Sequence, residues 1–159
     1  MRKILIAYDG SETSREALKE VEMFITQNEE IEFLLLSISN LSNPYTNAMM
    51  QRRIMDEEVE KIERQHDIKV KNEHVRQVQN QLDDVKKEFK KKGAKMEIEV
   101  RLVEGDHNPG ENICEYAETN DIDMIVVGSR GLGNIKKVFL GSVSNYVVNH
   151  SNVPVLVVK

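Results

Sequence analysis

The sequence predicts an open, doubly wound α/β sheet of five parallel strands with helices on both faces. Short apolar runs of strand length alternate along the chain with segments that have helical periodicity. The runs at 4–7 and 124–127 contain only apolar residues, which is typical of strands that a parallel sheet buries on both faces. The length of 159 residues is that of about one domain, so we expect a single domain over residues 1–159.

The first three elements form a predicted βαβ unit. The strand at 4–7 is followed by a turn at 9–11, where Ser11 suits a helix N-cap. Apolar residues recur at helical spacing between 17 and 25, and a second buried strand follows at 31–38. The crossover between two such strands is right-handed in nearly all proteins.

The segment at about 41–92 is elongated and charged, and we expect it to be helical and to lie between strands two and three. Residues 48–92 contain no proline or glycine, so the pattern fits one long helix or two helices with a break near 66–72. The second half carries a narrow apolar seam with gaps of 3 and 4 residues, formed by Val75, Val78, Leu82, Val85 and Phe89. Such a seam fits a helix that docks on its own sheet, and it also fits a helix that protrudes to meet a partner.

The rest of the chain repeats the alternation. In order, we expect strands at 95–103, 124–127 and 153–158, with helices around 113–117 and at 142–150. Gly93 is expected to end the long helix. Pro154 cannot donate to a strand ladder, which places the last strand at a sheet edge or the proline among its first residues.

The composition excludes several classes of function. The chain has 22 basic and 27 acidic residues, a net charge of −5, which argues against a nucleic-acid binder. The single cysteine, Cys114, cannot form an internal disulfide. No apolar run approaches the roughly 18 residues that span a bilayer, so we expect a cytoplasmic protein without a membrane partner.

One glycine-rich segment between a buried strand and a helix predicts anion binding. It comprises Gly128-Ser129-Arg130-Gly131-Leu132-Gly133 and then Gly141-Ser142-Val143-Ser144. Glycines allow close backbone approach, and a helix N-terminus favours negative charge. Residues 128–144 also include 3 basic side chains and no acidic one. In doubly wound sheets, ligands bind beyond the carboxyl ends of the strands where the strand order reverses, which points to Asp9 and Gly128.

This segment differs from two common phosphate-binding motifs. A P-loop requires a lysine directly before the serine, whereas Ser142 follows a glycine here. A dinucleotide fingerprint requires a third glycine at the position that Lys136 occupies. We therefore expect neither a P-loop nucleotidase nor an ordinary dehydrogenase.

The spacing Gly128-x2-Gly131-x9-Gly141-Ser142 resembles the nucleotide-binding signature of the universal stress protein (UspA-like) family, in its ATP-binding subgroup. Residues 4–11 are similar to that family's first strand and turn, and 150–158 to its last helix-to-strand junction. The resemblance covers roughly residues 1–40 and 93–159. It implies a Rossmann-like fold of the adenine nucleotide alpha-hydrolase type.

The resemblance also implies a ligand, ATP or another adenine nucleotide, with Mg²⁺ or Mn²⁺ near Asp9. The phosphate and ribose cradle would be shaped by Gly128, Arg130, Gly131 and Gly141. Backbone and hydroxyl donors to the phosphates would come from Ser142, Val143 and Ser144. Ala7 and Ile38 would flank the adenine, and Tyr8, Ser129 and Gly133 complete the candidate set. The glycines also suit a tight loop without a ligand, and Asp9 and Ser144 also suit turn and helix-start positions.

The resemblance implies a nucleotide-dependent sensor or adaptor in the stress response. The chain has no recognisable Ser-His-Asp pattern and no paired carboxylates in a defined context, so we name no catalytic residue and expect any ATP hydrolysis to be slow. The alternatives are a slow ATPase, or a dimeric interaction module that presents the helical segment at 50–90 to a protein partner. The family implies a homodimer through the last strand at 153–158, an apolar edge that would otherwise invite aggregation.

Overall fold

The computed structural model describes residues 2–25, 30–40, 57–103, 108–131 and 140–159. The predicted alternation of strands and helices is confirmed. In chain order the elements are β1 (Arg2–Ala7), α1 (Glu12–Ile25), β2 (Ile31–Asn40), α3 (Glu57–Lys91), β3 (Lys95–Val103), α4 (Pro109–Thr119), β4 (Met124–Gly128), α5 (Ser142–His150) and β5 (Val155–Val158). None of the helices among these residues is long and apolar enough to cross a membrane.

The five strands form one parallel sheet in the order β3-β2-β1-β4-β5. The chain first builds outward from β1 to β2 and β3, and then crosses to the other side of β1 for β4 and β5. The strand order therefore reverses between β1 and β4, which is where this class of sheet binds its ligands.

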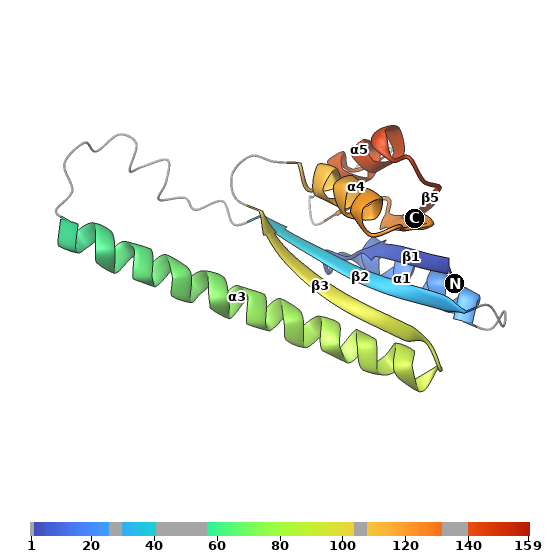
Figure 1. The fold of residues 1–159 in the computed structure, drawn as a ribbon, viewed down its shortest axis with the longest axis horizontal. Helices are drawn as coiled ribbons and strands as arrows, with labels where there is room; N and C mark the ends of the chain where they lie inside the picture. The colour runs from blue at the N-terminus through green and yellow to red at the C-terminus, as the bar shows by residue number, and fades with distance from the viewer. Residues whose placement is uncertain (1, 26–29, 41–56, 104–107, 132–139) are drawn as a thin grey trace.

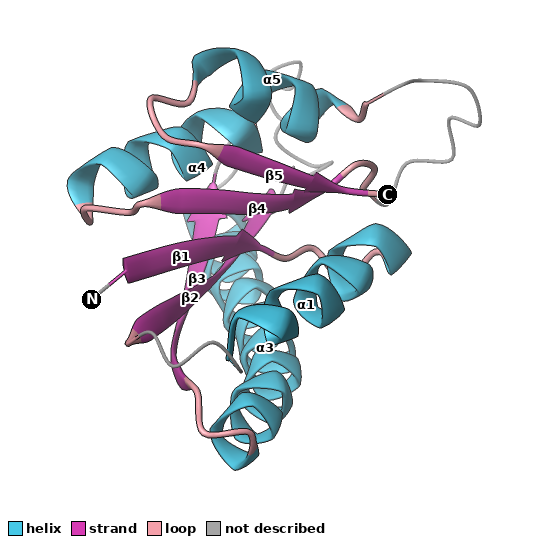
Figure 2. Cartoon of the chain, turned by 90° about the vertical axis from the view of Figure 1, so that its right-hand side faces the viewer, coloured by secondary structure: helices cyan, strands magenta, loops and turns pink. Residues whose placement is uncertain are grey.

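Helices cover both faces of the sheet, as predicted. The α1 and α3 helices lie on one face, and α4 and α5 lie on the other (Figure 2). Strand residues alternate between the two sides: Ile6 and Leu35 belong to the core under α1 and α3, whereas Leu5 and Leu36 belong to the core under α4 and α5. Burial on both faces explains why the middle of the sheet is apolar, at residues 4–7 in β1, 33–36 in β2 and 124–127 in β4.

The long helix α3 is continuous over its 35 residues, which decides between one helix and two. Its C-terminal half docks on the sheet, because Leu82 and Phe89 are buried and the Phe89 ring meets Phe33 edge-on at 5.6 Å. Its N-terminal half runs past the ends of β2 and β3 (Figure 1). There Ile68 and Val70 are 58% and 50% exposed. Docking and protrusion thus both occur, in different halves of one helix.

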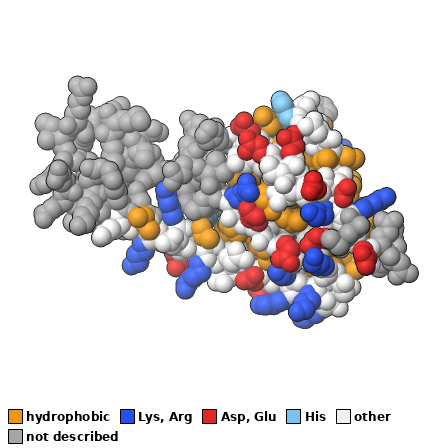
Figure 3. Space-filling view, in the orientation of Figure 1, with side chains coloured by type: hydrophobic (Ala, Val, Ile, Leu, Met, Phe, Trp, Pro, Cys, Tyr) orange, Lys and Arg blue, Asp and Glu red, His pale blue; other side chains and the backbone are white. Residues whose placement is uncertain are grey.

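Ion pairs reinforce the docked half of α3. Lys86 pairs with Glu97 of β3 at 3.4 Å, and just after the helix Lys92 pairs with Glu22 of α1 at 2.5 Å. On the side of the molecule seen in Figure 3, basic and acidic side chains are intermixed over the described residues. Gly93 ends the helix as predicted, with a φ of 84°, a left-handed conformation that glycine adopts without strain.

Two predicted boundaries were wrong by a few residues. The last strand begins at Val155 rather than at 153, and Pro154 precedes it. The Pro154 carbonyl still accepts from the Ile125 N–H at 2.9 Å, which agrees with a proline that can accept but cannot donate. The α4 helix begins at Pro109, inside the predicted loop, because the Asn108 side chain caps it by accepting from the Gly110 N–H.

Candidate functional site

A cavity of about 400 Å³ opens at the carboxyl ends of β1 and β4, where the strand order reverses. Its lining includes eleven of the residues predicted from the sequence: Ala7, Tyr8, Asp9, Ile38, Gly128, Arg130, Gly131, Gly141, Ser142, Val143 and Ser144. Segments far apart in the sequence thus meet at one place, as the rule for doubly wound sheets predicts.

Of the two other predicted residues, Ser129 does not line this cavity. Ser129 is buried, its N–H donates to the Val158 carbonyl at 2.6 Å, and its carbonyl accepts from the Gly141 N–H at 2.8 Å. Ser129 therefore ties the start of the loop to β5 and to the start of α5, which is a supporting role. Gly133 lies outside the described residues.

The first two glycines of the loop lie close to other parts of the protein, and at Gly128 the contact with backbone atoms leaves no room for a side chain. A Cβ on Gly128 would lie 2.5 Å from Thr13 Oγ1 and 2.8 Å from the Ser14 backbone nitrogen. A Cβ on Gly131 would lie 2.9 Å from Asp9 Oδ2. The sequence suggested that these glycines admit a ligand, whereas here Gly128 admits the first turn of α1 and Gly131 lies against the Asp9 carboxylate. Gly141 differs, because a Cβ there would make only ordinary contacts, the nearest at 3.5 Å.

Asp9 combines the turn role and the cavity position that the sequence left as alternatives. Its Oδ1 accepts from the Ser11 N–H at 2.9 Å, which closes the turn after β1. Ser11 in turn caps α1, because its Oγ accepts from the Ser14 N–H at 3.2 Å. The second carboxylate oxygen of Asp9 lies beside Gly131 at the cavity. Asp9 is therefore both a structural turn residue and an acidic group that faces the cavity.

The N-terminus of α5 supplies the polar end of the cavity. Gly141 is the N-cap and makes no side-chain cap, so the first N–H groups of the helix, from Ser142 to Ser144, lack intrahelical acceptors. The helix dipole adds partial positive charge at the same place. The Ser144 hydroxyl donates to the Gly128 carbonyl at 2.6 Å, so this hydroxyl holds α5 against the end of β4. The backbone of the first turn is left as the donor set for an anion.

The opposite end of the cavity is apolar. Val127 lies beside Ala7 in the β1–β4 ladder, and Leu36 and Ile38 share one side of β2. The α4 helix closes this end with Pro109 and Ile113. The sequence missed the lining residues Ser14, Leu36, Pro109, Ile113, Val127 and Leu140. The alternation of β2 could have indicated Leu36, but the α4 residues reach the cavity only through tertiary packing.

Charge in the described lining is limited to one acid and one base, Asp9 and Arg130. The described residues contain no group of three or more metal-binding side chains. Asp9 could contribute one oxygen ligand to Mg²⁺, which commonly takes one or two carboxylates and completes its shell with phosphates and water. The lining therefore fits a metal that arrives with a nucleotide.

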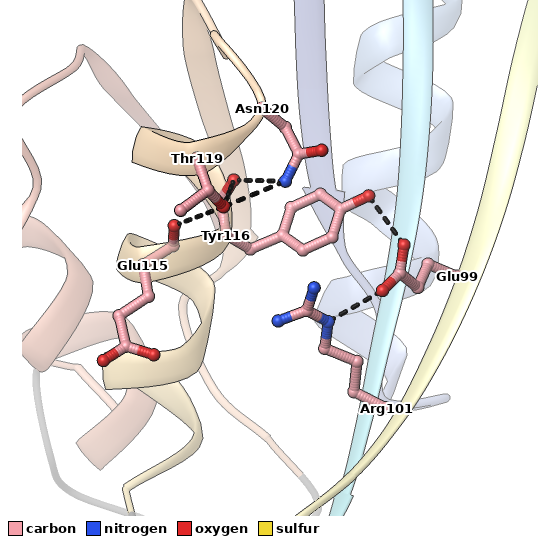
Figure 4. A network of polar contacts seen from close by, with 6 residues as sticks. All are labelled: Glu99, Arg101, Glu115, Tyr116, Thr119 and Asn120. Carbon is pink, nitrogen blue, oxygen red and sulfur yellow. Dashed lines mark hydrogen bonds and ion pairs between the residues drawn. The ribbon is translucent and has the colours of Figure 1, made fainter.

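A polar network joins α4 to the edge strand β3 (Figure 4). The Tyr116 hydroxyl donates to Glu99 at 2.9 Å, and Arg101 Nε donates to the same carboxylate at 2.8 Å. The Arg101 guanidinium also lies 4.5 Å from the centre of the Tyr116 ring. Burial and the bond to Glu99 raise the pKa of Tyr116 to about 12. Burial opposes ionisation of Glu99, but the bonds from Arg101 and Tyr116 outweigh it and lower the pKa of this carboxyl.

Known proteins resemble the chain over its full length. The model of the Universal stress protein family matches residues 1–159. The match includes the segment at 41–92, which the resemblance in the motifs did not cover. Universal stress protein MJ0577 of Methanocaldococcus jannaschii is 34% identical over 161 residues, which cover 99% of this chain and 94% of that protein. The solved structure of MJ0577 superposes with a TM-score of 0.77 at 32% identity and covers 99% and 95% of the two chains.

More distant members share the fold. An Arabidopsis thaliana family protein solved with AMP bound has a TM-score of 0.61 at 21% identity, with 100% of this chain and 92% of that chain covered. The Archaeoglobus fulgidus universal stress protein in complex with dAMP has a TM-score of 0.57 at 20% identity, with 100% and 98% covered. With its five-stranded parallel sheet and a family match over its full length, the chain belongs to the universal stress protein family.

Proposed function

We propose that this protein binds an adenine nucleotide, ATP by our expectation, in the cavity between β1 and β4 and acts as a nucleotide-dependent sensor or adaptor in the cytoplasmic stress response. The observation that carries the proposal is the division of one cavity into an apolar end and a helix N-terminus. An apolar slot suits a base, and free backbone N–H groups suit phosphates. The relatives solved with AMP and dAMP support the same ligand class.

In this proposal each end of the cavity has a distinct task. The base lies among Ala7, Ile38 and Ile113, and the phosphates accept from the first N–H groups of α5. The Arg130 guanidinium makes no ion pair with a described residue, so it is available to an anion. Asp9 meets the ribose or a phosphate-bound Mg²⁺ or Mn²⁺.

Mass spectrometry of small molecules released from the purified protein tests the proposal directly, followed by calorimetric titration with ATP and Mg²⁺. Binding raises the free energy of unfolding by about 2.7 kcal/mol when the free ligand is at a hundredfold excess over Kd. Absence of both a co-purified nucleotide and a thermal shift with ATP would overturn it.

Ser142→Pro and Ser142→Ala form a matched pair for this titration. Ser142 is the first residue of α5, where proline is well tolerated, and Gly141 before it has φ −66° and ψ 162°, the extended conformation that a following proline favours. The proline removes one N–H donor and leaves the helix intact. We expect Ser142→Pro to weaken ATP binding about tenfold or more and Ser142→Ala to weaken it less.

The role of Asp9 in metal binding has its own test. Asp9→Asn keeps an oxygen that can accept from the Ser11 N–H and removes the charge. We expect this variant to retain its fold and to lose most of the difference in ATP affinity between titrations with Mg²⁺ and with EDTA. An unchanged difference would assign Asp9 to the turn alone.

We further propose a homodimer that pairs β5 with the same strand of a second copy. The β5 strand lies at the edge of the sheet, and Val155, Leu156 and Val157 are only half-buried in the single chain. An apolar edge of this kind is normally covered.

The protruding half of α3 is the place that we propose for a protein partner. Ile68 and Val70 are large apolar side chains, and both are exposed. Substitution of both by Glu should abolish capture of a partner and leave ATP binding unchanged. Removal of residues 50–90 is not a suitable test, because Leu82 and Phe89 are core residues.

A further inference from the structure

We propose that Thr13 is a positioning residue for the nucleotide phosphates, because its hydroxyl fixes the Arg130 backbone on both sides of Cα and so directs the Arg130 side chain at the cavity. The inference rests on the proposed nucleotide binding and assigns a new role to the first turn of α1. Thr13 lies outside the glycine pattern that resembles the family signature, and no motif in the sequence indicated it.

A single side chain holds both backbone groups of Arg130. Thr13 Oγ1 donates to the Arg130 carbonyl through a short hydrogen bond, and it accepts from the Arg130 N–H at 3.3 Å. The Ser11 Oγ also donates to this carbonyl at 3.3 Å. Thr13 is only 8% exposed, so water competes poorly for these bonds.

These bonds belong to a series of anchors along the start of the loop. Ser129 is tied to β5 and to the start of α5, Arg130 is tied to α1, and Gly131 lies beside Asp9. The Arg130 backbone bonds among the described residues go to Ser11 and Thr13, and Thr13 is the one of the two that bonds both the N–H and the carbonyl. Loss of the Thr13 hydroxyl would remove the bond of the Arg130 N–H and leave its carbonyl with the Ser11 bond alone.

The orientation of the Arg130 backbone sets the direction in which its side chain leaves the loop. Because the Arg130 N–H and carbonyl face α1, they are not donors or acceptors for a ligand, and the Arg130 side chain is directed from a fixed backbone. Arg130 lines the cavity and is exposed, and its guanidinium has no carboxylate partner among the described residues. Thr13 therefore acts on phosphates through Arg130 and through the loop that leads to Gly131.

A purely structural role for Thr13 predicts a different outcome. If Thr13 only helps α1 pack on β4, its loss should lower stability and affect all ligands of the cavity alike. If it positions Arg130, its loss should affect ligands in proportion to their phosphates. Adenosine and ATP share the base and ribose and differ in charge, so their ratio separates the two roles.

The experiment compares Thr13→Val, which removes the hydroxyl at similar size, with Thr13→Ser, which keeps it. Thr119→Val is the matched control, because the Thr119 hydroxyl bonds within its own helix on the exposed side of α4. Full-length proteins are titrated with adenosine and with ATP by calorimetry. We expect Thr13→Val to weaken ATP about tenfold and adenosine by less than about twofold, whereas Thr13→Ser and Thr119→Val stay close to the wild type.

Amide hydrogen exchange of the ligand-free proteins gives a second readout. The Arg130 N–H should exchange faster in Thr13→Val than in the wild type, because it loses its acceptor. Equal losses for adenosine and ATP, or unchanged Arg130 exchange, would overturn the role of Thr13 while nucleotide binding stands. A wild type that binds neither ligand would instead overturn the proposed function and this inference together.

Discussion

Gly128 at the end of β4 lies directly against Thr13 in the first turn of α1, so that a Cβ on Gly128 would stand 2.5 Å from Thr13 Oγ1. The Ser14 nitrogen, at 2.8 Å, could move only with the helix backbone. We therefore expect Gly128→Ala to lower the free energy of unfolding by about 1–3 kcal/mol, the usual cost of overpacking. Urea unfolding followed by circular dichroism measures this change.

Gly141→Ala is the control for this prediction, because the cavity loop has room for its Cβ. The φ of −66° and ψ of 162° at Gly141 are open to alanine, so stability should change by less than about 0.5 kcal/mol. If both alanine variants lose the same free energy of unfolding, the cost of Gly128→Ala comes from the lost flexibility of the loop and not from contact with α1.

The Tyr116–Glu99 bond predicts a dependence of stability on alkaline pH. Burial and the bond to Glu99 raise the pKa of Tyr116 from 10.0 to about 12 in the folded state, so the neutral Tyr116 hydroxyl stabilises the fold fully below pH 10. As the pH rises from 10 to 12, the unfolded chain loses this proton first and the stabilisation disappears. Tyr116→Phe should cost about 1 kcal/mol at neutral pH, and the cost should shrink above pH 10. Urea unfolding of both proteins at a series of pH values gives the difference.

Glu99 provides an acid-side check on the same network. Its pKa is lowered in the folded state, so its bonds stabilise the fold above the ordinary carboxyl pKa and lose that effect as the pH falls through the lowered value. Tyr116→Phe removes one of the two bonds, so the Glu99 pKa should rise in the variant, as measured by carbonyl NMR. A constant stability difference from pH 4 to pH 12 would contradict the assigned bond.

The two halves of α3 should differ sharply in their effect on stability. Phe89 packs against Phe33 in the core, so Phe89→Ala should cost about 3–5 kcal/mol. Val70 is half exposed on the protruding half, so Val70→Ala should stay within about 0.5 kcal/mol of the wild type. Thermal or urea unfolding distinguishes them. A large loss in Val70→Ala would show that a second copy or another segment covers this half.

The sequence predicted the strands and the place of the cavity, but not the tertiary contacts that the glycines make. Apolar runs and turn residues indicated every strand, because a sheet buried on both faces admits few polar residues there. The position of Asp9 and of the loop at one cavity followed from the parallel topology. Gly128 and Thr13 touch although they are more than 70 positions apart in the sequence. Ile113 reaches the cavity only because α4 packs beside it. A local sequence pattern carries no information about contacts between distant segments. Asp9 could therefore be predicted from its position after β1, whereas Thr13 could not be predicted.

The edge strand β5 gives a test of the proposed homodimer that leaves the chain folded. The Pro154 carbonyl accepts from Ile125 and the Val158 carbonyl from Ser129, so the even-numbered residues of this strand bond inward to β4. By alternation, the backbone N–H of Val157 faces the open edge. Val157→Pro should remove one outward donor and no inward one, and so convert a dimer to a monomer, whereas Val157→Ala should remain dimeric. Light scattering measures the mass, and circular dichroism confirms the fold. A wild type that is monomeric at high concentration, or a Val157→Pro variant that stays dimeric, would refute pairing through this edge.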